Sequence, residues 1–504
     1  MKKLLCIIFI ITATFSFSAC KNGKDVITSA TIPDGYKELS VKENNGKKTQ
    51  GYGTQIDTHI YKPESGFSDQ ELDMLYDRVK EMNIQNVRTQ VFPEWYERGN
   101  DNSDHNVFDY DSLNVDFDST EMRQLFRLLD FCQANGILVD LSFYGCQPLF
   151  ESQDGKIKKS WLASPYTKNW ITSPKLVDEN GNAFAGLDEF AESVYALLNY
   201  VLNVKKYTCV NEFSVYPEPD LAYVTANASV SHTEYVELVK KVDAKLKKEG
   251  IRNKIQFSGP ATASSNVMGF NKYVTSLGEV FDKYTASTYR FDDKDDNGTL
   301  CDYGEGMVSL TDEINRSFGI AEFGSKNVVD PCNQTDIDTY ERALFLARYM
   351  ICLTNKGCVS MKYWEIADMY YGSSMMNLGL WKFRNNGYVA RPQYYTWSLI
   401  TKYTEVGSDV YPIISKDNEL CAIAFRLPDK SWSYMVCNTS NGVKKISFVN
   451  YNVGYPKNMN VYEVRASKCD GTVKPIASDK AIAIENGAIN VRVPANSFVV
   501  LSTK

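Results

Sequence analysis

The chain has 504 residues, of which 43% are hydrophobic and 23% are charged, and its net charge is -7. This composition is ordinary for a globular protein, and the length allows a barrel of roughly 250 residues together with a smaller domain. The acidic balance disfavours nucleic acid and strongly anionic polymers as partners.

The N-terminus has the features of a targeting segment. Two lysines precede an apolar stretch at 4–11 that is too short to span a bilayer. It leads to Phe17-Ser18-Ala19-Cys20, which resembles the lipobox of bacterial lipoproteins. The resemblance implies that 1–20 is a signal peptide, that Cys20 is acylated, and that the chain is anchored in the cell envelope. Because Lys21 gives no inner-membrane retention signal, the outer membrane is favoured. An ordinary secretion signal is the alternative, and it also places the chain outside the cytoplasm.

From residue 50 onward, short strands alternate with amphipathic helices, which is typical of a parallel sheet covered by helices. The clearest helices begin after an N-cap at Ser68 or end at Gly136 and Gly250. They are predicted at 69–82, 121–134, 233–249, 340–354 and 394–403. Eight strands are predicted, at 51–56, 86–91, 137–144, 208–211, 255–259, 284–289, 320–323 and 359–364. This alternation predicts a closed (β/α)8 TIM barrel over residues 50–404.

Two flanking segments differ from the barrel. Residues 21–49 are polar, and we interpret them as a tether that could donate one strand to the C-terminal domain. Residues 405–504 contain short alternating strands separated by turn signals such as Glu485-Asn486-Gly487. This pattern predicts a small β-sandwich packed on the barrel.

The loop after the third predicted strand, at about 145–185, is much longer than the usual two to six residues. It carries Trp161 and Trp170. Loops at the carboxyl ends of barrel strands form the active-site face. We therefore expect this loop to shape a substrate cleft, with these two tryptophans among the substrate-binding residues.

Chemically capable side chains gather at the predicted strand ends, where barrel enzymes keep their catalytic groups. Glycoside hydrolysis needs one carboxylic acid to protonate the leaving oxygen and one carboxylate to attack the sugar, about 5 to 5.5 Å apart in retaining enzymes. A nearby arginine favours the ionised form of the attacking group, and an aromatic ring offers a flat face to a sugar. The residues of these types are Arg88, which the second strand carries, and Asn211, Glu212, Tyr289, Glu322 and Trp364 at the ends of later strands.

These six positions resemble the pattern of glycoside hydrolase clan A, whose barrels carry an Asn-Glu pair after strand four and a Glu after strand seven. The resemblance covers roughly residues 50–400, and members of families 30, 39 and 51 extend it through a C-terminal sandwich. It implies a retaining glycosidase in which Glu212 is the acid/base and Glu322 is the nucleophile. It further implies that Arg88, Asn211, Tyr289 and Trp364 line the substrate site.

The sequence departs from the clan pattern at two points. Many clan members have proline after the Asn-Glu pair, but Phe213 follows here, and a Glu-Pro occurs slightly later in Pro217-Glu218-Pro219. Glu218 is therefore the rival acid, although Glu212 is preferred because it directly ends an apolar run. Some families carry a histidine near the third strand where this chain has Tyr144, which we include among the substrate-binding residues.

Other chemistries find little support in the sequence. The three histidines lack metal-ligand spacing, and no C-x-x-C pair is present. The acidic stretch 293–298 begins like a calcium loop but lacks the glutamate expected at position twelve, so a solvated loop is favoured. We expect neither a metal nor a cofactor. Disulfides are permitted in an extracytoplasmic protein but are not required by a chain of this size.

The sequence thus predicts a retaining β-glycoside hydrolase that acts on a carbohydrate polymer or its oligosaccharides. A non-catalytic glycan-binding lipoprotein on the same scaffold and a transglycosylase are the alternatives. The sugar, the linkage, the choice between endo and exo action, and the oligomeric state stay open.

Overall fold

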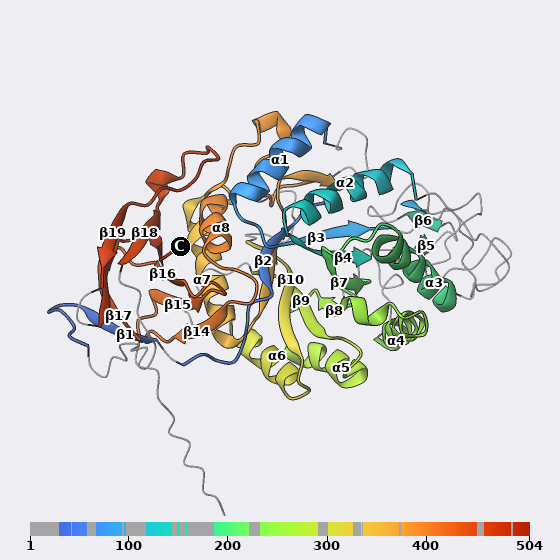
Figure 1. The fold of residues 1–504 in the computed structure, drawn as a ribbon, viewed down its shortest axis with the longest axis horizontal. Helices are drawn as coiled ribbons and strands as arrows, with labels where there is room; N and C mark the ends of the chain where they lie inside the picture. The colour runs from blue at the N-terminus through green and yellow to red at the C-terminus, as the bar shows by residue number, and fades with distance from the viewer. Residues whose placement is uncertain are drawn as a thin grey trace, which may run out of the picture.

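The computed structural model describes residues 30–41, 43–57, 67–92, 95–96, 117–143, 149–151, 157–159, 186–220, 232–290, 301–325, 334, 336–371, 374–450, 458–484 and 487–504. Within them the chain forms a closed barrel and a separate nine-stranded sheet (Figure 1). A search of these residues finds no helix with the length and apolar character needed to cross a membrane.

Eight strands, each parallel to its neighbours, close the barrel in the order β10-β11-β2-β3-β4-β7-β8-β9. This closure confirms the predicted TIM barrel. Strands covered on both faces are buried along their whole length, as β3 is. The barrel strands are β2 (Gly51–Gln55), β3 (Asn86–Val91), β4 (Leu138–Phe143), β7 (Val210–Val215), β8 (Gln256–Thr262), β9 (Lys283–Arg290), β10 (Ser317–Ser325) and β11 (Ser360–Tyr363).

Helices cover the outside of the barrel, and α7 and α8 lie between it and the second sheet (Figure 1). Ser68 caps the first helix in a reciprocal capping box with Glu71, as its position before the helix predicts. The helices are α1 (Asp69–Glu81), α2 (Thr120–Ala134), α3 (Gly186–Asn199), α4 (His232–Lys248), α5 (Val267–Leu277), α6 (Asp302–Asp312), α7 (Tyr340–Lys356) and α8 (Pro392–Lys402).

The second sheet is mostly antiparallel and has the strand order β19-β18-β21-β16-β15-β14-β1-β17-β20. Strand β1 (Lys37–Val41) comes from the segment before the barrel and lies between β14 and β17. The other members are β14 (Asp409–Ile413), β15 (Leu420–Arg426), β16 (Trp432–Asn438), β17 (Lys444–Asn450), β18 (Asn458–Val464), β19 (Lys480–Ala483), β20 (Ala488–Val493) and β21 (Ser497–Ser502). A hydrophobic cluster of its own fills this domain.

Polar contacts attach the sheet to helix α7. The Tyr340 hydroxyl donates to the Val464 carbonyl at 2.7 Å, and the Asn355 amide donates to the Ala422 carbonyl at 2.9 Å. Because α7 connects β10 to β11, the second sheet supports a helix whose two ends lead into the barrel.

One strand boundary differs from the prediction in a way that matters for the site. The fourth barrel strand is predicted to end at Asn211, but β7 continues to Val215. Phe213 and Val215 are buried in this continuation. Glu212 therefore lies inside the strand, and the carboxyl end of the strand is at the segment that contains Glu218.

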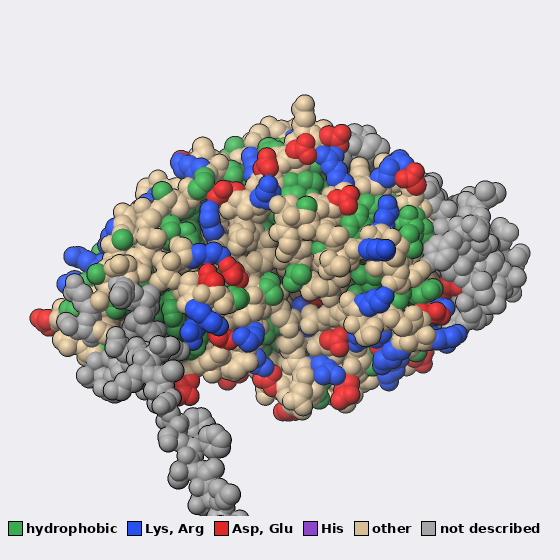
Figure 2. Space-filling model, viewed as in Figure 1, with side chains coloured by type: hydrophobic (Ala, Val, Ile, Leu, Met, Phe, Trp, Pro, Cys, Tyr) green, Lys and Arg blue, Asp and Glu red, His purple; other side chains and the backbone are tan. Residues whose placement is uncertain are grey.

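On the face shown in Figure 2, lysine and arginine side chains are interspersed with aspartate and glutamate. No large area of one sign dominates this face. This distribution agrees with the weak net charge and offers no basic stripe for a nucleic-acid backbone here.

Candidate active site

Arg88 organises a polar group inside the barrel. It lies on β3 and exposes none of its surface. Its Nη1 donates to Glu322 Oε2 at 2.8 Å and also to the Gln55 side chain, while Nη2 donates to Ser142 Oγ at 3.0 Å. These partners come from β10, β2 and β4, so the closed barrel positions the guanidinium from several sides.

Glu322 is bound by a second donor, the Tyr289 hydroxyl, at 2.5 Å from Oε1. Burial, followed by the charge of Glu322, raises the pKa of Tyr289 well above its ordinary value. The phenol therefore keeps its proton and donates it in this hydrogen bond. Glu322 thus has a donor on each carboxylate oxygen, and this arrangement fixes its orientation.

Trp364 completes one wall of this group. It directly follows β11, and its ring packs edge-to-face on Tyr289 with centroids 6.2 Å apart. Gly324 makes this approach possible, because a Cβ there would lie 3.0 Å from the Tyr289 ring and 3.2 Å from the Trp364 carbonyl oxygen. The structure therefore brings together Arg88, Tyr289, Glu322 and Trp364, which we call the Arg88 group.

Glu212, predicted to be the acid/base, does not lie in this group. It is 1% exposed and binds two ammonium groups, Lys283 at 2.6 Å and Lys362 at 3.0 Å. Lys362 also pairs with Asp140 at 2.6 Å. Ser214 lies two residues after Glu212 on the same face of β7. Its hydroxyl contacts Ser142, which is a partner of Arg88. Glu212 therefore sits one layer deeper in the barrel.

The electrostatics of Glu212 also disagree with a proton donor. Burial alone would raise the pKa of Glu212, but the charges of Lys283 and Lys362 overcome this effect and lower it to about 2. The group is thus a carboxylate at neutral pH and has no proton to give. We interpret it as part of a buried ion network that holds the barrel strands in register.

Asn211 takes part in none of the contacts described above. The pairing of β7 with β4 shifts register at this residue, since Val210 lies opposite Val139 and Glu212 lies opposite Asp140. Asn211 is partly exposed, whereas the other residues of β7 are buried. Its place in the substrate site stays a prediction.

Glu218 lies at the position, directly after the carboxyl end of the fourth barrel strand, that the sequence analysis expected for Glu212. It follows the carboxyl end of β7 and is 8% exposed. Its N–H donates to the carbonyls of Pro260 and Ala261 at the end of β8, and its φ of 58° is in the left-handed region. The Glu218 charge contributes to raising the pKa of Tyr289, so the Glu218 carboxyl group is a neighbour of the Arg88 group.

Further acids lie near Glu322 that the sequence analysis did not single out. Asp57 follows β2 and accepts from the Gln55 amide at 2.7 Å and from the Gln90 N–H at 2.9 Å. Glu365, next to Trp364, is fully buried, and neither carboxyl oxygen has a hydrogen-bond partner among the residues that the structure describes. Burial, followed by the charges of Asp57, Asp368 and Glu322, raises the pKa of Glu365 well above its ordinary value. No motif marks these residues, because only the barrel closure brings them together.

Four predicted residues, Tyr144, Trp161, Trp170 and Cys20, lie outside the described residues, as does the acidic stretch 293–298. Across the described ranges, no group of three or more His, Cys, Asp or Glu side chains could hold a metal ion.

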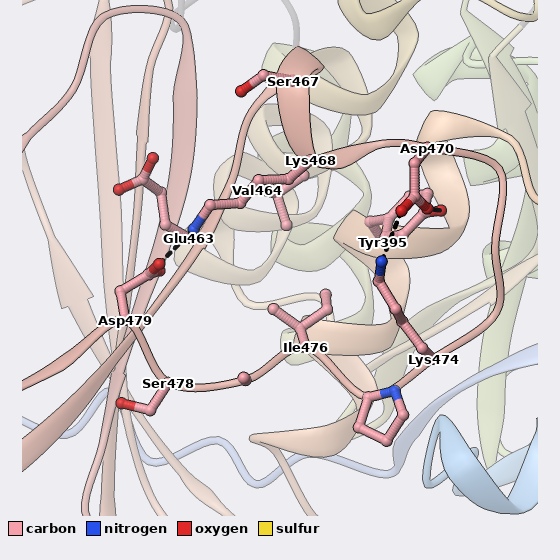
Figure 3. Close-up of a pocket in the computed structure, with 12 residues that line it drawn as sticks. Tyr395, Glu463, Val464, Ser467, Lys468, Asp470, Lys474, Ile476, Ser478 and Asp479 are labelled. Carbon is pink, nitrogen blue, oxygen red and sulfur yellow. Dashed lines mark hydrogen bonds and ion pairs between the residues drawn. The ribbon is translucent and has the colours of Figure 1, made fainter.

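A pocket of about 480 Å³ lies away from the barrel interior, between the segment 463–479 and Tyr395 of α8 (Figure 3). Its charged side chains are all paired, Lys468 with Asp479, Lys474 with Asp470, and Glu463 with Arg465 beside the pocket. The Tyr395 hydroxyl lies within hydrogen-bond distance of Asp470 and of the Thr472 carbonyl. None of the lining residues belongs to the Arg88 group, and the charges of the pocket are paired, so the Arg88 group is the better candidate.

Solved structures with a similar fold include several that are named as glycoside hydrolases. A GH30 endoxylanase from Clostridium papyrosolvens has 14% identity and a TM-score of 0.61, and the match covers 92% of this chain and 99% of that one. A GH39 β-xylosidase from Caulobacter crescentus has 15% identity and a TM-score of 0.59, with 92% and 98% covered. A glucosidase from Croceicoccus marinus has 12% identity and a TM-score of 0.64, with 94% and 99% covered.

At these identities the matches show a shared fold, which includes both the barrel and the second sheet because nearly all of each chain is covered. No protein-family model and no curated protein sequence matches this chain. The chemistry must therefore be argued from the residues of the site.

Proposed function

We propose that this chain is a retaining β-glycoside hydrolase in which Glu322 is the nucleophile and Glu218 is the acid/base. The observation that carries the proposal is the environment of Glu322. Its two oxygens accept from Arg88 and Tyr289, near the carboxyl end of the barrel, and it keeps 7% of its surface exposed. A carboxylate that is oriented by two donors and still reachable suits attack on an anomeric carbon.

In the proposed reaction, Glu218 donates its proton to the glycosidic oxygen while a Glu322 oxygen bonds to the anomeric carbon and the aglycone leaves. Water then attacks the glycosyl-enzyme, Glu218 takes a proton from that water, and Glu322 is released as a carboxylate. Two inversions at one carbon give net retention.

Two features support Glu218 as the acid. It follows the carboxyl end of β7, and barrel enzymes keep their catalytic groups at the carboxyl ends of the strands. Its backbone N–H donates to two carbonyls of β8, and these hydrogen bonds hold the Glu218 backbone in a defined position. Glu212, by contrast, is already occupied by two lysines.

The proposed substrate is a β-linked carbohydrate polymer or its oligosaccharides. The structural neighbours carry the names endoxylanase, β-xylosidase and glucosidase, which supports a neutral β-glycoside as the class. Trp364, next to the nucleophile, offers an aromatic face on which a sugar ring can stack. The acids around Glu322 make an anionic sugar unfavourable at this position.

We also propose that the protein is a cell-envelope lipoprotein acylated at Cys20, because the N-terminal segment has the charge, the apolar length and the cysteine of such signals. Metabolic labelling with a radioactive fatty acid tests this. Label is expected in the wild type and not in Cys20→Ser, and equal labelling of both would overturn the lipid site.

The function is tested by turnover on a panel of nitrophenyl glycosides and β-linked polysaccharides, with the anomeric form of the first product followed by NMR. Hydrolysis with a β product is expected. An α product from a β substrate would exclude a glycosyl-enzyme. No hydrolysis of any substrate in the panel, combined with retardation in a glycan affinity gel, would instead favour a non-catalytic glycan-binding protein.

A further inference from the structure

Two cysteines face each other across neighbouring strands of the second sheet. Cys421 lies on β15 and Cys437 on β16, and the antiparallel register makes them direct partners. Directly opposed residues in such a pair have Cα atoms about 4.5 to 5.5 Å apart. This spacing falls within the range of about 4.4 to 6.8 Å that disulfides require, so the backbone is already positioned for a bond.

Both thiols point to the same side of the sheet. The Cys437 Sγ donates to the Leu344 carbonyl of α7 at 3.8 Å, and both cysteines belong to the core cluster shared with that helix. Their strand neighbours Ala422 and Val436 belong to the other cluster, on the opposite side. The cysteine side chains therefore converge between the sheet and α7.

The thiols also interact directly. Interaction with the Cys437 thiol, followed by burial, raises the pKa of Cys421 well above its ordinary value. Both residues are almost fully buried, with Cys421 7% exposed and Cys437 0% exposed. A second pair of nearby thiols, Cys132 in α2 and Cys209 before β7, has no such register, and the Cys209 thiol donates to the Leu129 carbonyl at 3.6 Å.

We propose that Cys421 and Cys437 form a modification site, a dithiol that a protein or small-molecule disulfide oxidises to a cross-strand disulfide. One cysteine thiolate attacks the S–S bond of the oxidant, forms a mixed disulfide and releases one oxidant thiolate. The second cysteine thiolate then attacks the Sγ of the first, forms the Cys421–Cys437 bond and releases the other oxidant thiolate. The cysteines lose two electrons and two protons, and the oxidant gains them as two thiols.

The timing of this reaction follows from burial. In the folded protein neither thiol is accessible to a disulfide reagent, and the Cys421 thiol gives little thiolate. The bond therefore forms during folding, once the β15–β16 hairpin has paired and before it packs on α7. The hairpin is then cross-linked where it contacts the barrel. The proposal is independent of the enzymatic function.

The first test is a disulfide map of the full chain produced in the bacterial periplasm, unfolded in the presence of an alkylating reagent and digested with trypsin. Cleavage after Lys416, Arg426, Lys430 and Lys444 separates the two cysteines into peptides 417–426 and 431–444, with one cysteine each. The proposal predicts that these peptides are joined and that reduction releases them with a gain of two hydrogens. Alkylation of both cysteines in the unreduced sample would overturn it.

A thermal-melting experiment provides the second readout. Each protein is unfolded and refolded with or without a reducing agent, because burial shields the sulfurs in the folded protein. Refolding with the reducing agent is expected to lower the melting temperature of the wild type but not that of Cys437→Ala, which has no bond to lose. Cys132→Ala is the matched control, since it removes a buried thiol outside the pair and should keep the wild-type response to reduction. An equal response in wild type and Cys437→Ala would contradict the proposal.

Discussion

The Arg88 guanidinium and the Glu322 carboxylate form an ion pair of 2.8 Å inside the barrel, where Arg88 exposes none of its surface. The two residues lie far apart in sequence, on β3 and β10. Because the arginine also donates to Gln55 and Ser142, its position does not depend on Glu322. The carboxylate therefore meets a donor that is already in place, and this preorganisation is what electrostatic catalysis requires.

Arg88→Lys should keep the charge but lose the planar fork that contacts three strands at once. Hydrogen bonds to charged groups contribute about 1.5 to 3 kcal/mol each, so kcat/KM should fall about 10- to 150-fold. Arg78→Lys is the control, because Arg78 donates to the Tyr388 carbonyl outside the site. A wild-type rate for Arg88→Lys would show that the ion pair does not support the reaction.

Glu218→Ala should lose about 10²- to 10⁴-fold in rate on substrates with poor leaving groups, as expected for a lost general acid. Substrates with good leaving groups need no proton, so the first step should persist, and azide should restore turnover by replacing water at the glycosyl-enzyme. The measurement is the rate with and without azide on a nitrophenyl glycoside. If Glu212→Ala shows this rescue and Glu218→Ala does not, the assignment of the acid made here is wrong.

Glu212→Gln should act on stability. It leaves the buried ammonium groups of Lys283 and Lys362 with Asp140 as their remaining acidic partner among those observed. Breaking a buried ion pair in this way costs about 3 to 5 kcal/mol. Urea unfolding should report a loss of this size, while the rate per folded molecule stays close to wild type. Glu313→Gln, at an exposed position, should stay within about 0.5 kcal/mol.

Glu365→Gln should stabilise the protein in a pH-dependent way. The raised pKa of Glu365 means that the folded chain holds this proton more tightly than the unfolded chain. Its contribution to stability is therefore fully present below the unfolded pKa, near 4.5, and is lost as the pH rises toward the folded pKa. Glutamine keeps the neutral form at every pH. The free energy of unfolding should exceed that of wild type at pH 7, and the difference should disappear near pH 4. A difference that does not change with pH would exclude titration of Glu365 as its cause.

The order of strands and helices could be predicted from the sequence because each strand is a short apolar run bounded by turn residues. The change in the proposed acid, from Glu212 to Glu218, traces to one strand boundary. Asn211-Glu212 resembles a strand end, yet Phe213 and Val215 continue the buried strand, and the turn comes only at Pro217. The continuing apolar pattern was the available signal.

Other features depend on contacts that sequence reasoning does not reveal. Lys283 and Lys362 form ion pairs with Glu212. They come from strands later in the chain, and no local motif marks them. The cluster of Asp57 and Glu365 beside Glu322 likewise exists only because β2, β10 and β11 are adjacent in the closed barrel. Arg88, Tyr289 and Trp364 could be proposed because each stands on or directly after a clearly patterned strand.

The most direct test of the central claim is to find where a trapped glycosyl group attaches. The wild type is inactivated with the 2-fluoro analogue of whichever glycoside the substrate panel identifies. The masses of the tryptic peptides are then measured by mass spectrometry. Peptide 317–326 contains a single side-chain carboxylate, Glu322. The account predicts that this peptide gains one fluoroglycosyl group and that Glu322→Gln gains none. A label on the peptide that holds Glu212 or Glu218, or undiminished hydrolysis by Glu322→Gln, would contradict it.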